Sequence, residues 1–103
     1  NLLASGMATV TLIANKNNLP VIVGESGMVT TGGLATYGID YYNLGYKSGE
    51  MAVKILKGES EPADMAIEYL PADECELVVN TTSAKTLGLT ISEDILAKAK
   101  TVE

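Results

Sequence analysis

The chain has 103 residues, of which 47% are hydrophobic, and its formal net charge is -6. This length allows one small domain, and the absence of Trp and Phe predicts a mainly aliphatic core. The acidic balance argues against nucleic acid and an anionic membrane surface as partners, because no basic stripe is present to neutralise phosphates. Without histidine, catalytic triads and metal sites built on imidazole are excluded, and the single Cys75 cannot form an internal disulfide.

The first third of the chain carries a helix pattern followed by a strand pattern. Apolar residues recur at a spacing of three to four over Leu2–Ala14, which predicts a helix with Asn1 at or near its N-cap. The β-branched run Pro20–Gly24 predicts a buried parallel strand. Because Asn1 leads directly into the helical pattern, we expect the chain to be a fragment of a longer protein.

Residues 25–33 are rich in Gly and Thr, which predicts a loop. This loop follows the carboxyl end of a strand, where ligands bind in open α/β sheets. We therefore expect Glu25 and Ser26 to face a ligand, with a solvated connection as the alternative. The pair Gly32-Gly33 lacks the lysine and the spacing of a P-loop, so no phosphate site is predicted.

The middle of the chain changes from a strand to a long helix. Leu34–Ile39 is the second predicted strand, and either Asp40 or Asn43 caps the helix that follows. This helix is predicted to run to Lys57, with Gly58 as the residue that ends it.

The last third alternates between short strands and helices. We predict strands at Met65–Leu70 and Glu76–Asn80, the second either paired with the first or continuing near it, and a short helix at Ser83–Leu87. A final helix is predicted from Glu93 to about Val102, with Ser92 as its cap. The whole pattern predicts an α/β fold.

The segment Leu34–Ala52 resembles the signature of a family of ABC-transporter substrate-binding proteins that includes the tryptophan-binding lipoprotein type. The resemblance holds in order over further segments and covers nearly the whole chain. These segments are Ala8–Val23, Val53–Glu59, Pro62–Met65, Leu77–Asn80 and Leu87–Leu96.

The resemblance implies a type I periplasmic binding protein, of which this chain would form only the C-terminal portion of the two-lobe domain. Such a protein has two α/β lobes with flavodoxin-like parallel sheets, and it binds its ligand between them. Residues 1–39 would belong to the C-terminal lobe, and residues 40–64 would form a hinge crossing and a helix of the N-terminal lobe. Residues 65–103 would form the return crossing and the C-terminal helices.

The function implied by the resemblance is that of the solute-binding component of an ABC importer. The expected ligand is small and amino-acid-like. An aromatic amino acid is favoured, with a branched aliphatic amino acid, a purine nucleoside or another small solute as alternatives. The expected partner is an ABC permease. The full-length form would be a membrane-anchored lipoprotein on the extracellular or periplasmic face. No enzyme activity, cofactor or metal is expected.

A receptor for a free amino acid needs a carboxylate for the ammonium group, and Asp40 at a strand end is the candidate. Helix capping alone is the alternative role for Asp40. Rings such as those of Tyr37, Tyr41 and Tyr42 are suited to packing against the ligand side chain. The complete predicted ligand-binding set is Asn1, Glu25, Ser26, Tyr37, Gly38, Asp40 and Tyr41.

Two other functions compete with the receptor. The helix from Asn43 to Lys57 would expose an apolar side and the small residues Gly45 and Gly49, which predicts a self-associating fragment that forms a swapped homodimer. A small α/β enzyme is the weakest alternative, because the sequence contains no recognisable pair of nucleophile and base.

Overall fold

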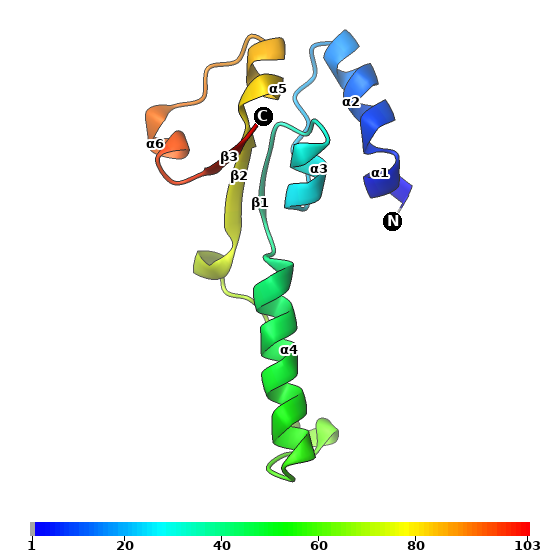
Figure 1. Ribbon diagram of the computed structural model, residues 1–103, viewed down its shortest axis with the longest axis vertical. Coiled ribbons are helices and arrows are strands. Elements are labelled where there is room, and N and C mark those ends of the chain that lie inside the picture. Colours follow the sequence, from blue (N-terminus) through cyan, green and yellow to red (C-terminus); the bar gives the residue numbers. More distant parts are fainter. Residues whose placement is uncertain (1) are drawn as a thin grey trace. The chain divides into compact units, whose positions relative to one another are not determined.

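The computed structural model describes residues 2–103 and divides into two compact units (Figure 1). The sheet unit comprises Asn1–Gly38 and Glu76–Glu103, and the helix unit comprises Ile39–Cys75. Asn1 itself lies outside the described residues, so its predicted roles as a cap and as a ligand contact are not addressed by the structure.

The sheet unit begins with two helices, α1 (Leu2–Ser5) and α2 (Met7–Lys16). A single helix was predicted for this region, but the backbone at Gly6 has φ -93° and ψ 6°, which separates the two. Met7 is 1% exposed and Ala14 is also buried. These two residues are seven positions apart, which is two helical turns, so they lie on the same side of α2 and this side faces the core.

The unit contains a mixed three-stranded sheet in the order β1-β2-β3. β1 (Ala35–Gly38) pairs antiparallel with β2 (Glu76–Asn80), with Gly38 opposite Glu76. β2 in turn pairs parallel with β3 (Lys100–Val102). The predicted α/β class is therefore confirmed, with one antiparallel pair in the sheet.

The buried strand predicted at Pro20–Gly24 is not formed as expected. Only Ile22 bridges β1, in parallel with Ala35, and its side chain is 68% exposed. The segment runs along the outer edge of β1, whose other edge is occupied by β2, so it is covered on one side only. An edge position explains why an apolar run here remains largely exposed.

The core of the sheet unit is aliphatic, as predicted, and centres on the middle strand. β2 contributes both Val78 and Val79, each 1% exposed, and because successive side chains of a strand point to opposite faces, both faces of the sheet are covered at this point. The buried hydrophobic residues are Met7, Ala14, Val29, Leu34, Val78, Val79 and Ala84.

The loop predicted at residues 25–33 contains a short helix, α3 (Ser26–Thr30), which packs against β1 and β2 (Figure 1). Glu25 caps this helix, because its carboxylate accepts from the backbone N–H groups of Gly27 and Met28, both at 2.8 Å. Val29, with no exposed surface, anchors α3 to the core. The loop prediction was wrong because Glu25 supplies a cap that the Gly and Thr content did not indicate.

The C-terminal segment also differs from its prediction. The short helix α5 (Thr81–Thr86) is present, but the long helix expected from Glu93 to Val102 is not. Instead α6 (Glu93–Leu96) is a single turn, and the chain then forms β3 beside β2. The local helix signal is overridden by a pairing that extends the sheet, which sequence periodicity does not reveal.

The helix unit consists of α4 (Tyr41–Leu56) and two short 3₁₀ helices, η1 (Pro62–Asp64) and η2 (Ala72–Glu74). The strand predicted at Met65–Leu70 is absent, because both edges of its expected partner β2 are occupied by β1 and β3. Lys47 of α4 instead forms an ion pair of 3.3 Å with Glu68 in this segment.

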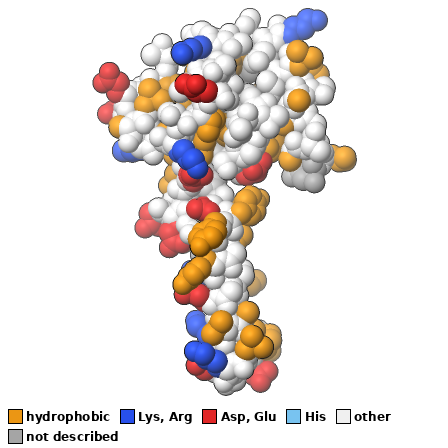
Figure 2. All heavy atoms as spheres, viewed as in Figure 1, with side chains coloured by type: hydrophobic (Ala, Val, Ile, Leu, Met, Phe, Trp, Pro, Cys, Tyr) orange, Lys and Arg blue, Asp and Glu red, His pale blue; other side chains and the backbone are white. Residues whose placement is uncertain are grey.

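No residue of α4 is buried, and hydrophobic side chains are spread over the surface of this unit in Figure 2. The exposed large apolar residues of the unit are Ile39, Tyr41, Tyr42, Tyr46, Val53, Ile55, Leu56, Ile67 and Tyr69. An exposed array of this kind marks a surface that ordinarily contacts another part of a protein or another chain. Among residues 2–103, no helix combines the length and apolar character that crossing a membrane requires.

Candidate functional site

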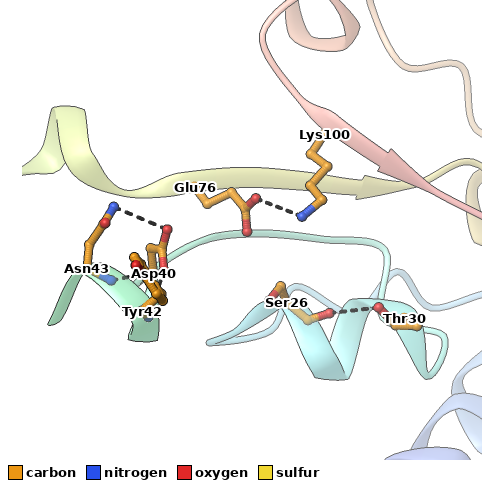
Figure 3. A network of polar contacts seen from close by, with 7 residues as sticks. All are labelled: Ser26, Thr30, Asp40, Tyr42, Asn43, Glu76 and Lys100. Atoms are coloured by element: carbon orange, nitrogen blue, oxygen red, sulfur yellow. Dashed lines mark hydrogen bonds and ion pairs between the residues drawn. The ribbon is translucent and has the colours of Figure 1, made fainter. Parts of the chain in front are cut away.

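Asp40 lies at the N-terminus of α4 and caps it (Figure 3). Its Oδ1 accepts from the backbone N–H of Tyr42 at 2.8 Å and of Asn43 at 3.3 Å. Its Oδ2 accepts from the side-chain amide of Asn43 at 3.2 Å. The predicted capping role is therefore confirmed, and these bonds fix the direction of the carboxylate, whose remaining lone pairs can accept from a ligand.

The capping role predicts a modest and separable effect of mutation. Asp40→Ala should lower the free energy of unfolding by about 1 kcal/mol, because two N–H groups of the first turn lose their acceptor. Asp40→Asn should cost less, since an amide oxygen can still cap the helix. Urea unfolding followed by circular dichroism at 222 nm measures both values. Equal stability of the alanine variant and the wild type would contradict the role.

Four further predicted residues lie at one end of the sheet unit. Tyr37 and Gly38 end β1, while Glu25 and Ser26 follow the segment that bridges it. Gly38 approaches Gly24 so closely that a Cβ atom on Gly38 would lie 2.8 Å from the Gly24 carbonyl oxygen. The structure thus brings the end of β1 beside the residue that precedes Glu25.

The residues at this end of the sheet unit differ in their hydrogen bonds and in their exposure to solvent. Both carboxylate oxygens of Glu25 bond to the first turn of α3, which fixes that side chain. The Ser26 carbonyl accepts from the Thr30 hydroxyl at 3.2 Å (Figure 3). Tyr37 is 60% exposed, so much of its ring surface is open to a ligand.

Tyr41 and Tyr42 stand beside Asp40 in the helix unit, and both are largely exposed. The predicted residues therefore form two groups. Glu25, Ser26, Tyr37 and Gly38 lie together in the sheet unit, and Asp40 and Tyr41 lie together in the helix unit.

An ion pair lies close to the group formed by Glu25, Ser26, Tyr37 and Gly38. Lys100 Nζ lies 3.2 Å from Glu76 Oε1, which joins β3 to the start of β2 (Figure 3). The lysine side chain is 66% exposed, so solvent screens the pair and its contribution to stability is small. Within residues 2–103, no cluster of three potential metal ligands is found.

Two buried polar residues were missed by the sequence reasoning. Asn80 joins β2 to α5: its Oδ1 accepts from the Ser83 N–H at 2.8 Å and its Nδ2 donates to the Val29 carbonyl at 2.9 Å. An asparagine between a strand and a helix is a capping signal that could have been recognised. Thr36 of β1 is 2% exposed, and nothing in its sequence context indicates that its hydroxyl is buried.

Comparison with known proteins identifies the family. Residues 1–103 match the family model described as ABC transporter substrate binding protein. The chain belongs to this family. The predicted resemblance is therefore confirmed, and the expectation that the chain is not an enzyme agrees with a family of substrate-binding proteins.

Similar proteins agree with this assignment. A tyrosine-binding protein of Clostridioides difficile (strain R20291) is 43% identical over 89 residues, which cover 86% of this chain. An ABC domain from Streptococcus pneumonia in complex with L-Trp is 36% identical, with a TM-score of 0.85 over 100% of this chain. A conserved domain protein from Vibrio cholerae is 32% identical, with a TM-score of 0.84 over 98%.

The chain is shorter than these relatives. It spans 25% of the tyrosine-binding protein, 34% of the Streptococcus domain and 33% of the Vibrio protein. A ligand-free, open structure of a substrate binding protein with adhesive properties from Clostridium difficile is 43% identical and also covered over 33% of its length, with a TM-score of 0.72.

Proposed function

We propose that the full-length protein carrying this chain is the solute-binding component of an ABC importer, with a small amino acid as its ligand. The observation that carries this proposal is the family match over residues 1–103. An aromatic ligand is favoured, because one relative is named for tyrosine and a similar structure contains L-Trp. Tyr37 and Tyr41 both present exposed rings suited to an aromatic side chain.

The division into two units supports a two-lobe arrangement in the full-length protein. The chain leaves the sheet unit after Gly38 and returns at Glu76, and the intervening helix unit has no buried residue on α4. In this proposal α4 belongs to the other lobe, residues 39–40 and 75–76 lie at crossings, and ligand binding closes the lobes. Asp40 would then accept from the ligand ammonium group while it caps α4.

The proposal includes a location and a partner. A receptor of this family delivers its ligand to an ABC permease, so the full-length protein would act on the extracellular or periplasmic face of the membrane. Anchoring as a lipoprotein is part of the same proposal, and it rests on the family alone.

Ligand-dependent thermal unfolding of the full-length protein tests the receptor function. Ligand at about 100 times its dissociation constant should add about 2.7 kcal/mol to the free energy of unfolding, which appears as a raised Tm. L-tyrosine and L-tryptophan should give the largest shifts, and L-leucine and a purine nucleoside serve as comparison ligands. The proposal fails if none of these compounds, nor any other amino acid, shifts the Tm.

Self-association of the isolated chain is the second candidate, favoured by the exposed apolar residues of α4. A Cβ atom added to Gly45 or Gly49 would have no atom within 4 Å, so another backbone could approach this side closely. Sedimentation equilibrium decides the matter. A monodisperse monomer in which α4 is fully helical would refute self-association.

A further inference from the structure

The Thr36 hydroxyl is a buried polar group without a partner. Its residue is 2% exposed, and its Oγ1 makes no hydrogen bond within the part of the chain that the structure describes. A buried hydroxyl that lacks a partner destabilises the conformation in which it occurs. A nearby acceptor that moved within reach would therefore be favoured, and the question is which acceptor that is.

The Gly24 carbonyl is an acceptor that borders the same space as the Thr36 hydroxyl. Thr36 and Gly38 are two residues apart on β1, so they share a face of the strand. A Cβ atom on Gly38 would lie 2.8 Å from Thr36 Oγ1 and also 2.8 Å from the Gly24 carbonyl oxygen. Both oxygens thus border the space that the absent side chain of Gly38 leaves open. Among residues 2–103, no hydrogen bond to the Gly24 carbonyl is found.

Gly24 lies just past the segment that bonds to β1. It is exposed, no atom lies within 4 Å of its own Cβ position, and Ile22 is the last bridged residue before it. The next residues are Glu25 and Ser26, which belong to the predicted ligand-binding set. The orientation of the Gly24 peptide group therefore sets how the backbone enters Glu25 and Ser26.

We propose that Thr36 is a positioning residue for ligand binding, because its hydroxyl and the Gly24 carbonyl oxygen border the same space at the end of β1. In the ligand-bound protein the Thr36 hydroxyl donates to this carbonyl and holds Glu25 and Ser26 in place. Ligand contact with Ser26 and formation of this hydrogen bond then favour each other. The inference rests on the proposed receptor function and adds a residue that does not itself touch the ligand.

The test uses calorimetric titration of the full-length protein with L-tyrosine and L-tryptophan. Thr36→Val keeps the shape of the side chain but removes the hydroxyl, and it should raise the Kd about three- to tenfold, the range expected for one neutral hydrogen bond. Thr36→Ser should restore the Kd to within about twofold of the wild type. Thr101→Val, on the exposed surface of β3, is the matched control and should leave the Kd unchanged.

The Tm of the ligand-free protein separates positioning from a structural role. Because valine removes an unpaired hydroxyl, Thr36→Val should leave this Tm unchanged or raise it while binding weakens. The inference is overturned if Thr36→Val binds as the wild type does. It is also overturned if binding and the ligand-free Tm fall together, because the hydroxyl would then be structural. If the wild type binds no amino acid, the receptor function itself fails and the inference fails with it.

Discussion

Gly32→Ala is expected to lower the free energy of unfolding by about 3 kcal/mol, the combined effect of backbone strain and overpacking. Gly32 has φ +116°, a conformation that residues with a side chain rarely adopt. An added Cβ would lie 2.7 Å from Thr11 Oγ1 and closer still to Thr11 Cγ2. The backbone has little freedom to relax, because the Gly32 carbonyl accepts from Ser83 Oγ at 3.0 Å and its N–H donates to Val29.

Two variants separate the causes of this loss. Gly49→Ala is the matched control, since nothing lies within 4 Å of its Cβ position, and it should stabilise α4 by about 0.5–1 kcal/mol. Adding Thr11→Ala to Gly32→Ala should relieve the steric contact with the new Cβ atom. Relative to the Thr11→Ala single variant, the remaining loss of unfolding free energy then reports the backbone strain at position 32. Urea unfolding measures each value. A Gly32→Ala variant within about 0.5 kcal/mol of the wild type, as for an ordinary surface substitution, would contradict the prediction.

Asn80→Ala is expected to destabilise the protein by a similar amount, about 3 kcal/mol, from a lost helix cap, one buried N–H left unpaired and a buried carbonyl left with one donor in place of two. Asn80 is 4% exposed, and its side chain joins the start of α5 to the last turn of α3. Without it, the Ser83 N–H loses its acceptor in the interior, and the Val29 carbonyl keeps only the Gly32 N–H as a donor. Chemical denaturation monitored by circular dichroism gives the change in unfolding free energy.

The two bonds of Asn80 can be tested individually. Asn80→Asp keeps the acceptor for Ser83 but replaces the donor to Val29 with a carboxylate oxygen, so its stability should lie below the wild type through the lost bond and through the charge buried beside a carbonyl oxygen. Asn43→Ala is the exposed counterpart, because its amide bonds only to Asp40 at the surface, and it should change stability by less than about 0.5 kcal/mol. Equal losses at Asn43 and Asn80 would show that burial does not set the size of the effect.

The parts of the fold that sequence predicted well depend on near neighbours in the chain. Asp40 was one of two candidate caps, and the structure shows it bonded to residues two and three positions ahead. Gly58 was predicted to end α4, and it has φ +70°, which glycine adopts without strain. Such signals are complete within four residues, so a sequence contains all the information that they require.

The parts that failed depend on residues far away in the chain. β1 occupies one edge of β2, so only one further segment can pair with its other edge. In the structure this segment is Lys100–Val102 and not Met65–Leu70. The residues of the two segments do not by themselves indicate which one pairs. Lys100–Val102 was predicted to be the end of the helix that starts at Glu93, yet it forms a strand that pairs with Val78–Asn80. Long-range pairing of this kind outweighs local propensity, which is weak for short segments.

The candidate site divides in the same way. Sequence placed Glu25 and Ser26 after a strand end, and the structure brings that strand end beside Gly38. It did not reveal that Glu25 caps α3, because the helix is only five residues long. The burial of Thr36 was equally hidden, since a threonine in a strand can face either water or the interior.

The pairing of Gly38 with Glu76 has a consequence for how this protein can evolve. These two residues are direct Cα partners on adjacent antiparallel strands, although all of Ile39–Cys75 lies between them in the chain. Adjacent strands of this kind are most commonly joined by a two-residue turn. The sheet unit is therefore equivalent to a hairpin whose turn has been replaced by an insertion. The register of β1 on β2 therefore does not depend on the length of that segment, so its length can change away from Asp40 and Tyr41 without displacing the sheet.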